Sequence, residues 1–463
     1  MRPRGPKQHN GQMHSHSHRS PDLGWHNWAG NVTANPRRTT SPSSAPEVAA
    51  AITKAAAADL TVRMTGSGHS FTPTAVTDGV MLRPDRLTAI RSVDSAAKTV
   101  TVEAGCPLHV LNAELLARGL SLANMGDIQV QTVAGAVQTG THGTGRDVGG
   151  MAAQVAGLEL VLADGSIVTC SAESPSGGLT LSDGTPADLF DAARVGLGAL
   201  GIVTAVTFRV VPAFLLEARE EPMTWSAVIS QLDELTSDNE HFEFYWFPHS
   251  EGCSTKRNNR TEGAARPLPR WRYALDDEFL ANTVFGLSCQ LGRRVPSVIP
   301  VINSAAARAL GARTYVDAAY RVFTSPRRVR FKEEEYAIPR AALSDVLAEV
   351  RALFRRRDWR IGFPIEVRVT PSDDVWLSTA YGRDSAYIAI HVFHSAPHEQ
   401  YFADVEAVMT SVGGRPHWGK MHTRDADYLA GTYPRLSEFI ALRDLVDPDR
   451  RFGNAYLRQV LGS

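Results

Sequence analysis

Two short stretches combine histidine with glycine in a way that suits ligand binding. TGSGHSF, residues 65–71, places His69 among small residues, and by itself it also fits a turn with a solvated imidazole. NMGDIQVQTVAGAVQTGTHGTG, residues 124–145, places His142 among Gly, Ala, Thr and Val. Successive small residues let backbone N–H groups converge on an anion. The second stretch therefore indicates a phosphate-bearing ligand, with a buried glycine-rich strand connection as the alternative.

The stretch FPIEVRVTP, residues 363–371, carries a pair of opposite charges at strand spacing. Residues two apart in a strand share a face, so Glu366 and Arg368 point away from the apolar residues between them. One face suits a core and the other a polar pocket. A cross-strand ion pair on a solvated surface is the alternative reading.

Further titratable residues follow in the last quarter of the chain. His391 lies in YIAIHVFH, and a lone strand histidine is more often structural than catalytic. The turn-rich stretch GGRPHWGKMH, residues 413–422, contains Arg415, His417, Lys420 and His422. Cationic groups held in a turn could neutralise a developing negative charge. Together these side chains would furnish a pocket.

One motif imitates a nicotinamide-dinucleotide site. GLGALG, residues 196–201, matches G-x-G-x-x-G, which has this meaning only where it follows a strand and opens a helix. Its continuation, IVTAVTFRVVP, alternates as a strand and ends at proline. We therefore expect no Rossmann helix at this point, although the backbone there could still approach another ligand closely.

The elements that must position these residues are short and mixed. The first half predicts helices at residues 48–60 and 107–122 and strands at 61–66, 79–84, 87–94 and 98–105, so that the loop at 65–71 follows a strand. The second half predicts an amphipathic helix at 340–357 and strands at 241–248 (HFEFYWFP), 284–290 (VFGLSCQ), 328–339 (RVRFKEEEYAIP), 363–371 and 387–394.

Composition limits the class of protein. The 463 residues are enough for two domains, or for one large domain with an insertion. Lys and Arg number 48 against 49 Asp and Glu, so the net charge of −1 gives no overall field that favours nucleic acid or an anionic membrane. Four scattered cysteines show no metal-like spacing and indicate reduced thiols in a cytoplasmic protein, and we expect no metal ion.

The chain ends and its hydropathy allow two more expectations. Residues 1–24 are polar and rich in Gly, Pro, Ser and His, which predicts a disordered tail; its HSHSH stretch suits solvated histidines better than a weak metal site. We find no uninterrupted apolar run long enough to span a bilayer, so we expect no transmembrane segment.

Seven stretches in order resemble one known family: GSGHSF, NMGDIQVQTVAGAVQTGTHGTG, GLGALGIVTAV, IEVR, AYGRDS, RPHWGK and LVDPDRRFGNAYLRQVLG. They are similar to the sugar-lactone and alditol oxidases of the vanillyl-alcohol oxidase superfamily of flavoproteins. Within that group the resemblance is to actinobacterial L-gulono-1,4-lactone dehydrogenases and D-arabinono-1,4-lactone oxidases. It runs from about Trp25 to the C-terminus.

The resemblance implies an α+β fold in two domains. Residues 25–213 would form an FAD-binding domain of two mixed subdomains, of the PCMH type rather than the Rossmann type. The C-terminal segment, at about 424–463, would pack back on it. Residues 214–423 would form a substrate or cap domain with an antiparallel sheet and flanking helices.

The resemblance also implies roles for the small-residue loops. His69 matches the residue that, in some members, is bonded covalently to the flavin ring, so FAD attached through His69 is the expected cofactor. The other expected cofactor-binding residues are Gly66, Ser67, Gly68, Ser70, Phe71, Gly135, Thr141, His142, Gly143, Thr144, Gly201 and Ile202.

The implied reaction transfers hydride from a sugar carbinol to the flavin while the hydroxyl loses a proton. By resemblance Glu366 and Arg368 would bind the reacting hydroxyl, Lys420 would supply positive charge, and His391 would be a further polar wall or proton carrier. Which group accepts the proton stays open. Pairing with Arg368 predicts that the Glu366 carboxylate is ionised.

Gly126 and Asp127 bear on the electron acceptor and the substrate. Gly126 matches a position where a small residue admits oxygen to the reduced flavin. Asp127 replaces the serine of alditol oxidases, which favours an aldonolactone substrate over an open-chain polyol. The alternatives are an alditol oxidase acting on xylitol or sorbitol, a lactone dehydrogenase linked to a cytochrome or quinone, and a flavin-binding protein without turnover.

Overall fold

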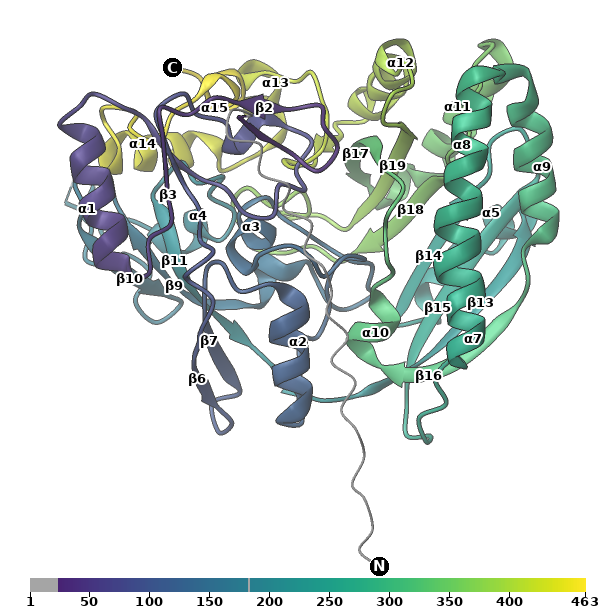
Figure 1. Ribbon diagram of the computed structural model, residues 1–463, viewed down its shortest axis with the longest axis horizontal. Helices are drawn as coiled ribbons and strands as arrows, with labels where there is room; N and C mark the ends of the chain where they lie inside the picture. Colours follow the sequence, from purple (N-terminus) through teal and green to yellow (C-terminus); the bar gives the residue numbers. More distant parts are fainter. Residues whose placement is uncertain (1–23, 182–183) are drawn as a thin grey trace, which may run out of the picture.

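The computed structural model describes residues 24–181 and 184–463 (Figure 1). The disordered tail predicted for residues 1–24 therefore lies outside the described residues except for its last position. Within the described ranges, the strands form sheets of three, five and eight strands and two two-stranded ribbons. No helix of these ranges is long and apolar enough to cross a membrane.

A small parallel sheet carries the first glycine loop. Its strand order is β3 (Arg38–Thr40), β5 (Val80–Leu82) and β4 (Val62–Met64). Helix α1 (Ala45–Ala56) covers it, and the Ser44 hydroxyl caps that helix by accepting a hydrogen bond from the Glu47 N–H. Phe452, near the C-terminus, lies in the same apolar core. The loop at 65–71 leaves this sheet directly after β4.

An antiparallel five-stranded sheet forms the second layer. Its order is β10 (Ile167–Ser171), β9 (Val155–Val161), β11 (Ile202–Arg209), β7 (Thr99–Glu103) and β6 (Ile90–Asp94). Helices α2 (Leu108–Ala117), α3 (Val133–Gln138) and α4 (Leu189–Ala193) contribute to its core. The second glycine-rich stretch, taken from the sequence as a loop, thus contains the short helix α3.

The C-terminal helices return to this core. They are α13 (Ala426–Thr432), α14 (Leu436–Val446) and α15 (Ala455–Leu461), and their buried side chains belong to the same cluster as those of β7, β9 and β11. Figure 1 shows them in yellow beside the purple N-terminal part.

The largest sheet is antiparallel throughout. Its order is β16 (Arg313–Ala318), β13 (Leu215–Thr224), β15 (Gly252–Thr261), β14 (His241–Trp246), β18 (Ile365–Thr370), β19 (Ser385–Phe393), β17 (Phe331–Pro339) and β20 (Arg415–Pro416). Alternate residues of its central strands form one core with helices α5 (Trp225–Ser230), α6 (Leu232–Ser237), α11 (Leu343–Arg356) and α12 (Glu399–Ser411). The remaining residues of these strands present a polar face.

A helical hairpin lies over the β13–β15 end of the large sheet, at the right of Figure 1. It consists of α7 (Arg270–Tyr273), the π-helix η3 (Ala274–Val284), α8 (Phe285–Arg294), η4 (Pro296–Val298) and α9 (Ile299–Ala309). The strand predicted for residues 284–290 is therefore wrong. Its seven residues were too few to reveal a helical stretch that runs from Arg270 to Arg294 and passes from α to π and back to α.

Short elements connect these layers: β1 (Trp25–His26), β2 (Thr33–Ala34), β8 (Leu120–Ser121), β12 (Val211–Pro212), α10 (Ala319–Phe323), η1 (Pro73–Ala75), η2 (Met151–Gln154) and η5 (Arg340–Ala342). The mixed layers and the antiparallel sheet with flanking helices confirm the predicted α+β class and cap architecture.

Candidate active site

Two adjoining cavities lie where the glycine-rich loops meet the polar face of the large sheet. The loop cavity, about 100 Å³, is lined mainly by residues 63–70, 131–139 and 197–203. The sheet cavity, about 740 Å³, is lined by β14, β17, β18 and β19 and by the helical hairpin. Both are bounded by His69, Ser70, Gln131 and Thr139, so one ligand can extend from the first into the second.

The loop cavity offers backbone donors. No described residue accepts a hydrogen bond from the N–H groups of Ser67, Gly68, His69 or Ser70. Gly68 has a φ of +74°, which favours glycine, and a Cβ on Gly66 would lie 2.5 Å from Thr132 Oγ1. Successive free N–H groups around such a gap form an anion-binding concavity. The loop therefore suits the pyrophosphate of a dinucleotide.

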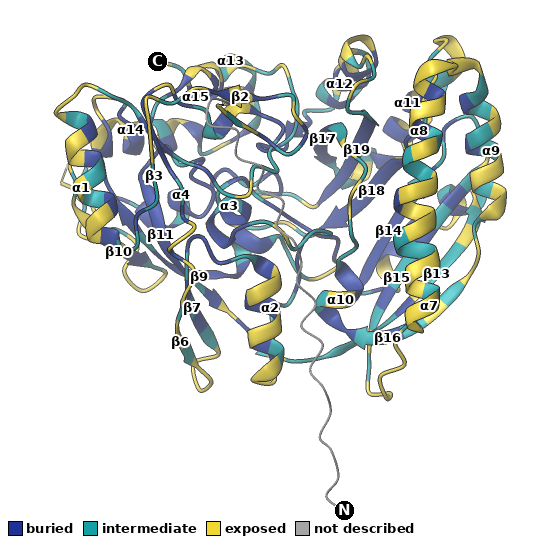
Figure 2. Cartoon of the chain, viewed as in Figure 1, coloured by how far each residue is buried: buried dark blue, intermediate teal, exposed yellow. Residues whose placement is uncertain are grey.

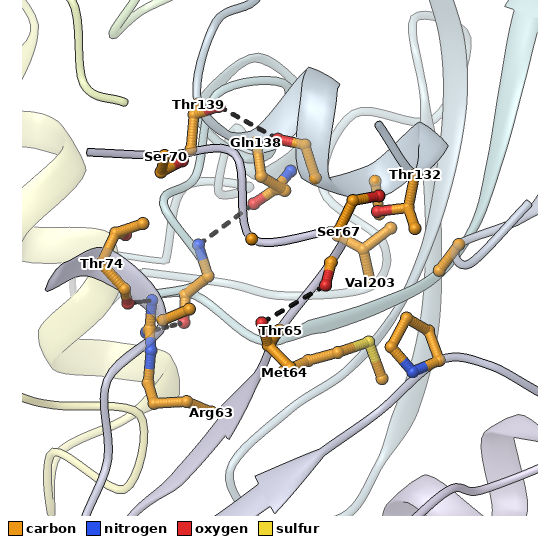
Figure 3. Close-up of a pocket in the computed structure, with 18 of the residues that line it drawn as sticks. Arg63, Met64, Thr65, Ser67, Ser70, Thr74, Thr132, Gln138, Thr139 and Val203 are labelled. Carbon is orange, nitrogen blue, oxygen red and sulfur yellow. Dashed lines mark hydrogen bonds between the residues drawn. The ribbon is translucent and has the colours of Figure 1, made fainter. Parts of the chain in front are cut away.

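Side chains around the loop cavity carry polar atoms that lack partners. Thr132 Oγ1, Thr74 Oγ1 and Arg63 Nε are buried without a hydrogen bond to any described residue. Figure 3 shows Arg63, Thr74 and Thr132 around the opening with Ser67 and Gln138. Buried polar groups are normally paired, so these atoms fit a polar ligand that would occupy the cavity.

The GLGALG stretch forms the floor of the loop cavity rather than the start of a helix. Arg63 donates to the carbonyl oxygens of Leu197 at 2.6 Å and Gly198 at 2.8 Å, and β11 follows at Ile202. Leu197 and Gly198 have φ values of +54° and +62°. Gly201 and Ile202 line the cavity. The expectation that no Rossmann helix opens here is confirmed.

His69 stands at the junction of the two cavities. Its ring stacks on Trp28 with centroids 5.2 Å apart, and no described residue hydrogen-bonds to its ring nitrogens. Burial, with a smaller contribution from the Lys420 charge, lowers the pKa of His69 to about 4. The imidazole is therefore neutral at physiological pH, and its nitrogen lone pair is free to act as a nucleophile.

The sheet cavity is polar along β14 and β18. Arg368 forms an ion pair with Glu366 and donates from Nε to Glu243 Oε2 at 3.0 Å. The Tyr245 hydroxyl donates to Glu366 Oε1 at 2.9 Å. Asp127 Oδ2 accepts from Arg327 Nη2 at 2.9 Å and lies 3.7 Å from Arg368 Nη2. The predicted pair thus belongs to a larger set of charges, in which Glu243, Glu366 and Arg368 are buried and Asp127 and Arg327 are partly exposed.

The pKa of Glu366 is raised from its usual value although Arg368 lowers it. Burial raises its pKa, and the charges of Asp127 and Glu243 raise it further, so that Arg368 does not restore the usual value. Ionisation of Glu366 through Arg368 stays a prediction: Arg368 lowers the pKa as expected, but it is opposed by burial and by two more acids near the same arginine, which the sequence did not reveal. At Asp127, by contrast, Arg327 and Arg368 outweigh burial and lower the pKa.

A second charge cluster surrounds Lys420. Its ammonium group forms an ion pair with Glu333 and lies 3.9 Å from Glu335 Oε2. Burial opposes its charge, but both glutamates favour it, and the pKa of Lys420 is raised. His391 Nε2 lies 3.3 Å from the other oxygen of Glu333. Glu333 therefore fixes Lys420 and His391 at neighbouring points of the same wall.

A third cluster comprises His142, Glu335 and His417. His142 Nε2 lies 3.2 Å from Glu335 Oε1, and the His142 ring stacks on Tyr387 at 3.6 Å. One ligand atom from each member lies within 4.8 Å of the others, a spacing that could hold a metal ion. The Lys420 ammonium, 3.9 Å from Glu335, would repel such a cation. The arrangement suits hydrogen bonding to a ligand better.

The structure brings most of the predicted site residues to the two cavities. Among those that line the loop cavity are Gly66, Ser67, Gly68 and Gly135. The sheet cavity is lined by Phe71, Gly126, Asp127, Thr141, His142, Glu366, Arg368, His391 and Lys420. Gly143 and Thr144 line neither: Gly143 lies against the Met125 carbonyl, and Thr144 Oγ1 donates to the Val369 carbonyl at 3.2 Å. Arg415 and His422 also lie outside, bonded to backbone carbonyls and to Tyr456.

Sequence reasoning missed the residues that hold the site together. Glu333 and Glu335 share a face of β17, and the alternation in FKEEEY could have revealed them by the rule used for Glu366 and Arg368. Glu243 and Tyr245 follow the same rule in β14. Arg327 lies outside every helix and strand, where no periodic signal exists.

Family models match both halves of the chain. The model described as D-arabinono-1,4-lactone oxidase matches residues 206–460, and the model described as FAD binding domain matches residues 36–171. The second range contains the loop at 65–71 and its free N–H groups. These findings and the features of the loop cavity agree that FAD is the cofactor.

Relatives match over nearly their whole length. L-gulono-1,4-lactone dehydrogenase of Mycobacterium tuberculosis is 42% identical, covering 95% of this chain and 99% of its own. L-gulonolactone oxidase of Bos taurus is 33% identical, covering 94% and 97%. Cholesterol oxidase from B. sterolicum superposes with a TM-score of 0.79 at 17% identity, covering 95% of this chain and 96% of its own, which shows a shared fold.

The geometry of the glycine loop predicts the effect of one methyl group. Gly66→Ala would place a Cβ 2.5 Å from Thr132 Oγ1 and narrow the loop cavity. Overpacking of this kind typically costs about 1–3 kcal/mol of free energy. If this cost falls on the FAD complex, FAD should bind roughly 10- to 100-fold more weakly. Fluorescence titration in a His69→Ala background measures this with freely exchanging FAD. Gly362→Ala, whose Cβ would meet nothing within 4 Å, is the matched control. Equal affinities would show that FAD does not use this loop.

Proposed function

The chain belongs to the D-arabinono-1,4-lactone oxidase family, and we propose that it oxidises an aldono-1,4-lactone, such as L-gulono- or D-arabinono-1,4-lactone, with FAD as hydride acceptor. One observation carries the proposal. Glu366, Arg368 and Lys420 form a polar wall of the sheet cavity, and His69, which also borders the loop cavity, lines this same cavity. A sugar hydroxyl on this wall would lie beside the flavin.

The wall residues bind the hydroxyl that reacts. Arg368 can donate to its oxygen, and Glu366 can accept its proton. The raised pKa of Glu366 brings this carboxylate closer to the value of an efficient general base. Tyr245 and Glu243 hold the pair in place. His391, tied to Glu333, is a second polar contact for the sugar. Bound FAD supplies the group that accepts a hydride from the carbinol carbon.

Lys420 supplies fixed positive charge. Glu333 and Glu335 keep it protonated, and its position is set by the turn after β20, where the Lys420 N–H donates to the His417 carbonyl at 2.9 Å. A preorganised cation in a site with little water stabilises negative charge that develops during hydride transfer. We therefore assign Lys420 to charge stabilisation.

Asp127 favours a lactone over an alditol. Its carboxylate lines the sheet cavity and stays ionised beside Arg327 and Arg368. An ionised carboxylate and an arginine at one point can bind adjacent ring hydroxyls as acceptor and donor. Alditol oxidation is the alternative, and it needs only the Glu366–Arg368 pair.

Gly126 bears on the electron acceptor. It lines the sheet cavity, and a Cβ at this position would meet Thr141 Cγ2 at 3.0 Å. The space left by the missing side chain supports access of oxygen to the reduced flavin, and oxygen is our proposed acceptor. An acceptor protein or a quinone is the alternative. The four cysteines, all free and buried, support a cytoplasmic location.

We propose that the two domains have the separate roles that the sequence predicts. Residues 25–213 and about 424–463 hold FAD, and residues 214–423 supply the substrate wall. The shared core of β7, β9, β11 and α13–α15 supports the first grouping. The position of Glu366, Arg368 and His391 on the large sheet supports the second.

The substrate can be tested through the colour of the flavin. Without oxygen, L-gulono-1,4-lactone should bleach the flavin absorbance of the purified holoenzyme, and xylitol should not. The speed at which the colour returns in air then separates oxygen from other acceptors. Bleaching by xylitol alone would support the alditol alternative, and no bleaching by either or by D-arabinono-1,4-lactone would indicate a flavin-binding protein without this turnover.

Removing the Lys420 charge should slow the reduction step. Lys420→Met keeps the length and volume of the side chain, and loss of one preorganised charge contact typically costs a factor of about 100 or more in rate. Stopped-flow bleaching with the lactone measures the rate, and the FAD-to-protein ratio should not change. Lys332→Met, on the same strand as Glu333 but bonded to His398, is the control. Wild-type rates in Lys420→Met would refute the assigned role.

His69 should hold the flavin covalently. Its neutral imidazole at the junction of the cavities has free ring nitrogens. Acid precipitation of the wild-type protein should carry the yellow colour into the pellet, whereas His69→Ala should release FAD into the supernatant. Colour in the wild-type supernatant would show noncovalent binding.

A further inference from the structure

Exposed apolar side chains of this molecule are concentrated on one element. Of the fourteen large apolar side chains that are exposed in the described residues, ten lie between Trp271 and Val301, in the hairpin α7–α9. The other four, Val110, Val130, Ile167 and Leu445, are scattered over distant elements. Figure 2 shows the hairpin as the largest continuous exposed area on the right of the molecule. Isolated exposed apolar residues are normal, but a cluster marks an interaction surface.

The sheet cavity explains only part of this cluster. Leu280 and Val284 line the cavity, so a bound ligand can cover them. The other eight form what we call the outer face: Trp271, Tyr273, Leu275, Phe279, Leu287, Leu291, Val295 and Val301. Trp271, Leu287 and Val301 are 69%, 60% and 71% exposed. The described chain leaves each of the eight at least 42% exposed.

The unpaired charges around the outer face are all positive. Arg270, Arg293, Arg294 and Arg308 are exposed and form no ion pair with any described residue. The acids of the hairpin are already neutralised: Asp277 by Arg313 at 2.8 Å, Asp276 by Arg272 at 3.2 Å and Glu278 by Arg328 at 2.6 Å. The outer face therefore combines aromatic and aliphatic side chains with free positive charge.

We propose that the outer face docks on the surface of a bilayer that contains anionic phospholipid. Helices that lie in a membrane interface combine Trp, Phe and Leu on one side with Arg or Lys at its margin. The apolar side chains would enter the boundary between headgroups and acyl chains. The four free arginines would contact phosphates, to which arginine binds in a bidentate manner. A net charge of −1 for the whole chain does not oppose this, because membrane fields act over about one Debye length.

A lipid surface fits this face better than a second copy of the chain. In a two-fold interface the same patch meets itself, so the free arginines of both copies would gather with no exposed acid between them. Burying unpaired charges of one sign is costly. Anionic headgroups complement the arginines, and acyl chains complement Trp271, Leu287 and Leu291 in the same contact.

Docking would also place the sheet cavity at the membrane. The inward side of the same helices lines that cavity with Leu280, Ala281, Val284, Ile302 and Ala306. One hairpin thus presents apolar side chains to both the outside and the active site. The docking itself requires no turnover, so its test is independent of the lactone reaction.

Vesicle sedimentation of the holoenzyme tests the proposal. We expect binding to vesicles of phosphatidylglycerol and phosphatidylcholine, little binding to pure phosphatidylcholine, and release at high salt. Leu287→Asp/Leu291→Asp should lower the bound fraction at least about tenfold, while Ile167→Asp/Leu445→Asp, at comparably exposed sites elsewhere, should not. Arg293→Ser/Arg294→Ser should weaken binding roughly 5- to 30-fold, since each surface arginine contributes about 1 kcal/mol. Arg37→Ser/Arg38→Ser is its matched control.

Other results would overturn the proposal. Absence of binding to the anionic vesicles, or equal losses in the hairpin and control variants, would exclude the outer face as a lipid site. A dimer by light scattering without lipid, made monomeric by Leu287→Asp/Leu291→Asp, would assign the face to a second copy. Bleaching of the flavin by the lactone at the wild-type rate in each variant shows that the variant is folded. If the lactone does not bleach even the wild-type flavin while the wild-type protein binds the anionic vesicles, the proposed reaction is refuted and the docking is not.

Discussion

The buried charges on the polar face of the large sheet constrain the rest of the structure. Four carboxylates, those of Glu243, Glu333, Glu335 and Glu366, lie there with almost no contact with water, and the carboxylate of Asp127 beside them is 27% exposed. A carboxylate removed from water needs a cation or hydrogen-bond donors close by. Arg327, Arg368 and Lys420 meet this need, and they come from a loop, a central strand and a late turn. Parts of the chain far apart in sequence must therefore close on this face together, and Asp127 fastens the glycine-rich stretch to it.

A second constraint fastens the end of the chain to its beginning. The guanidinium of Arg63, the middle residue of β4, donates to the Phe452 carbonyl at 2.8 Å as well as to the floor of the loop cavity. The Asn454 amide donates to the carbonyls of Pro73, Thr74 and Val76. The segments on both sides of the loop that would bind the pyrophosphate are thus held by residues that follow nearly 400 positions later in the sequence. This explains why a stretch so rich in glycine can keep one conformation.

Much of this arrangement could be predicted, and the failures have physical causes. Strand alternation placed Glu366 and Arg368 opposite Ile365, Val367 and Val369, because a sheet with one face in a core enforces that period. The same reasoning failed at residues 284–290, where seven residues fit either period and the neighbouring helix decided. The raised pKa of Glu366 could not be predicted, since it comes from burial and from the charges of Asp127 and Glu243, which only the fold brings to Arg368. Arg327 was missed because loop residues carry no periodic signal.

Lys420 connects the two cavities electrostatically. Glu333 and Glu335 keep it charged, and the same charge lowers the pKa of His69 beyond the effect of burial. A neutral His69 has a free lone pair, whereas a protonated ring would offer none. The cation that we assign to charge stabilisation during oxidation therefore also favours the neutral state of His69. A change at Lys420 would therefore alter the electrostatic potential in both cavities, and the charge of Lys420 depends on the same pair of glutamates in β17.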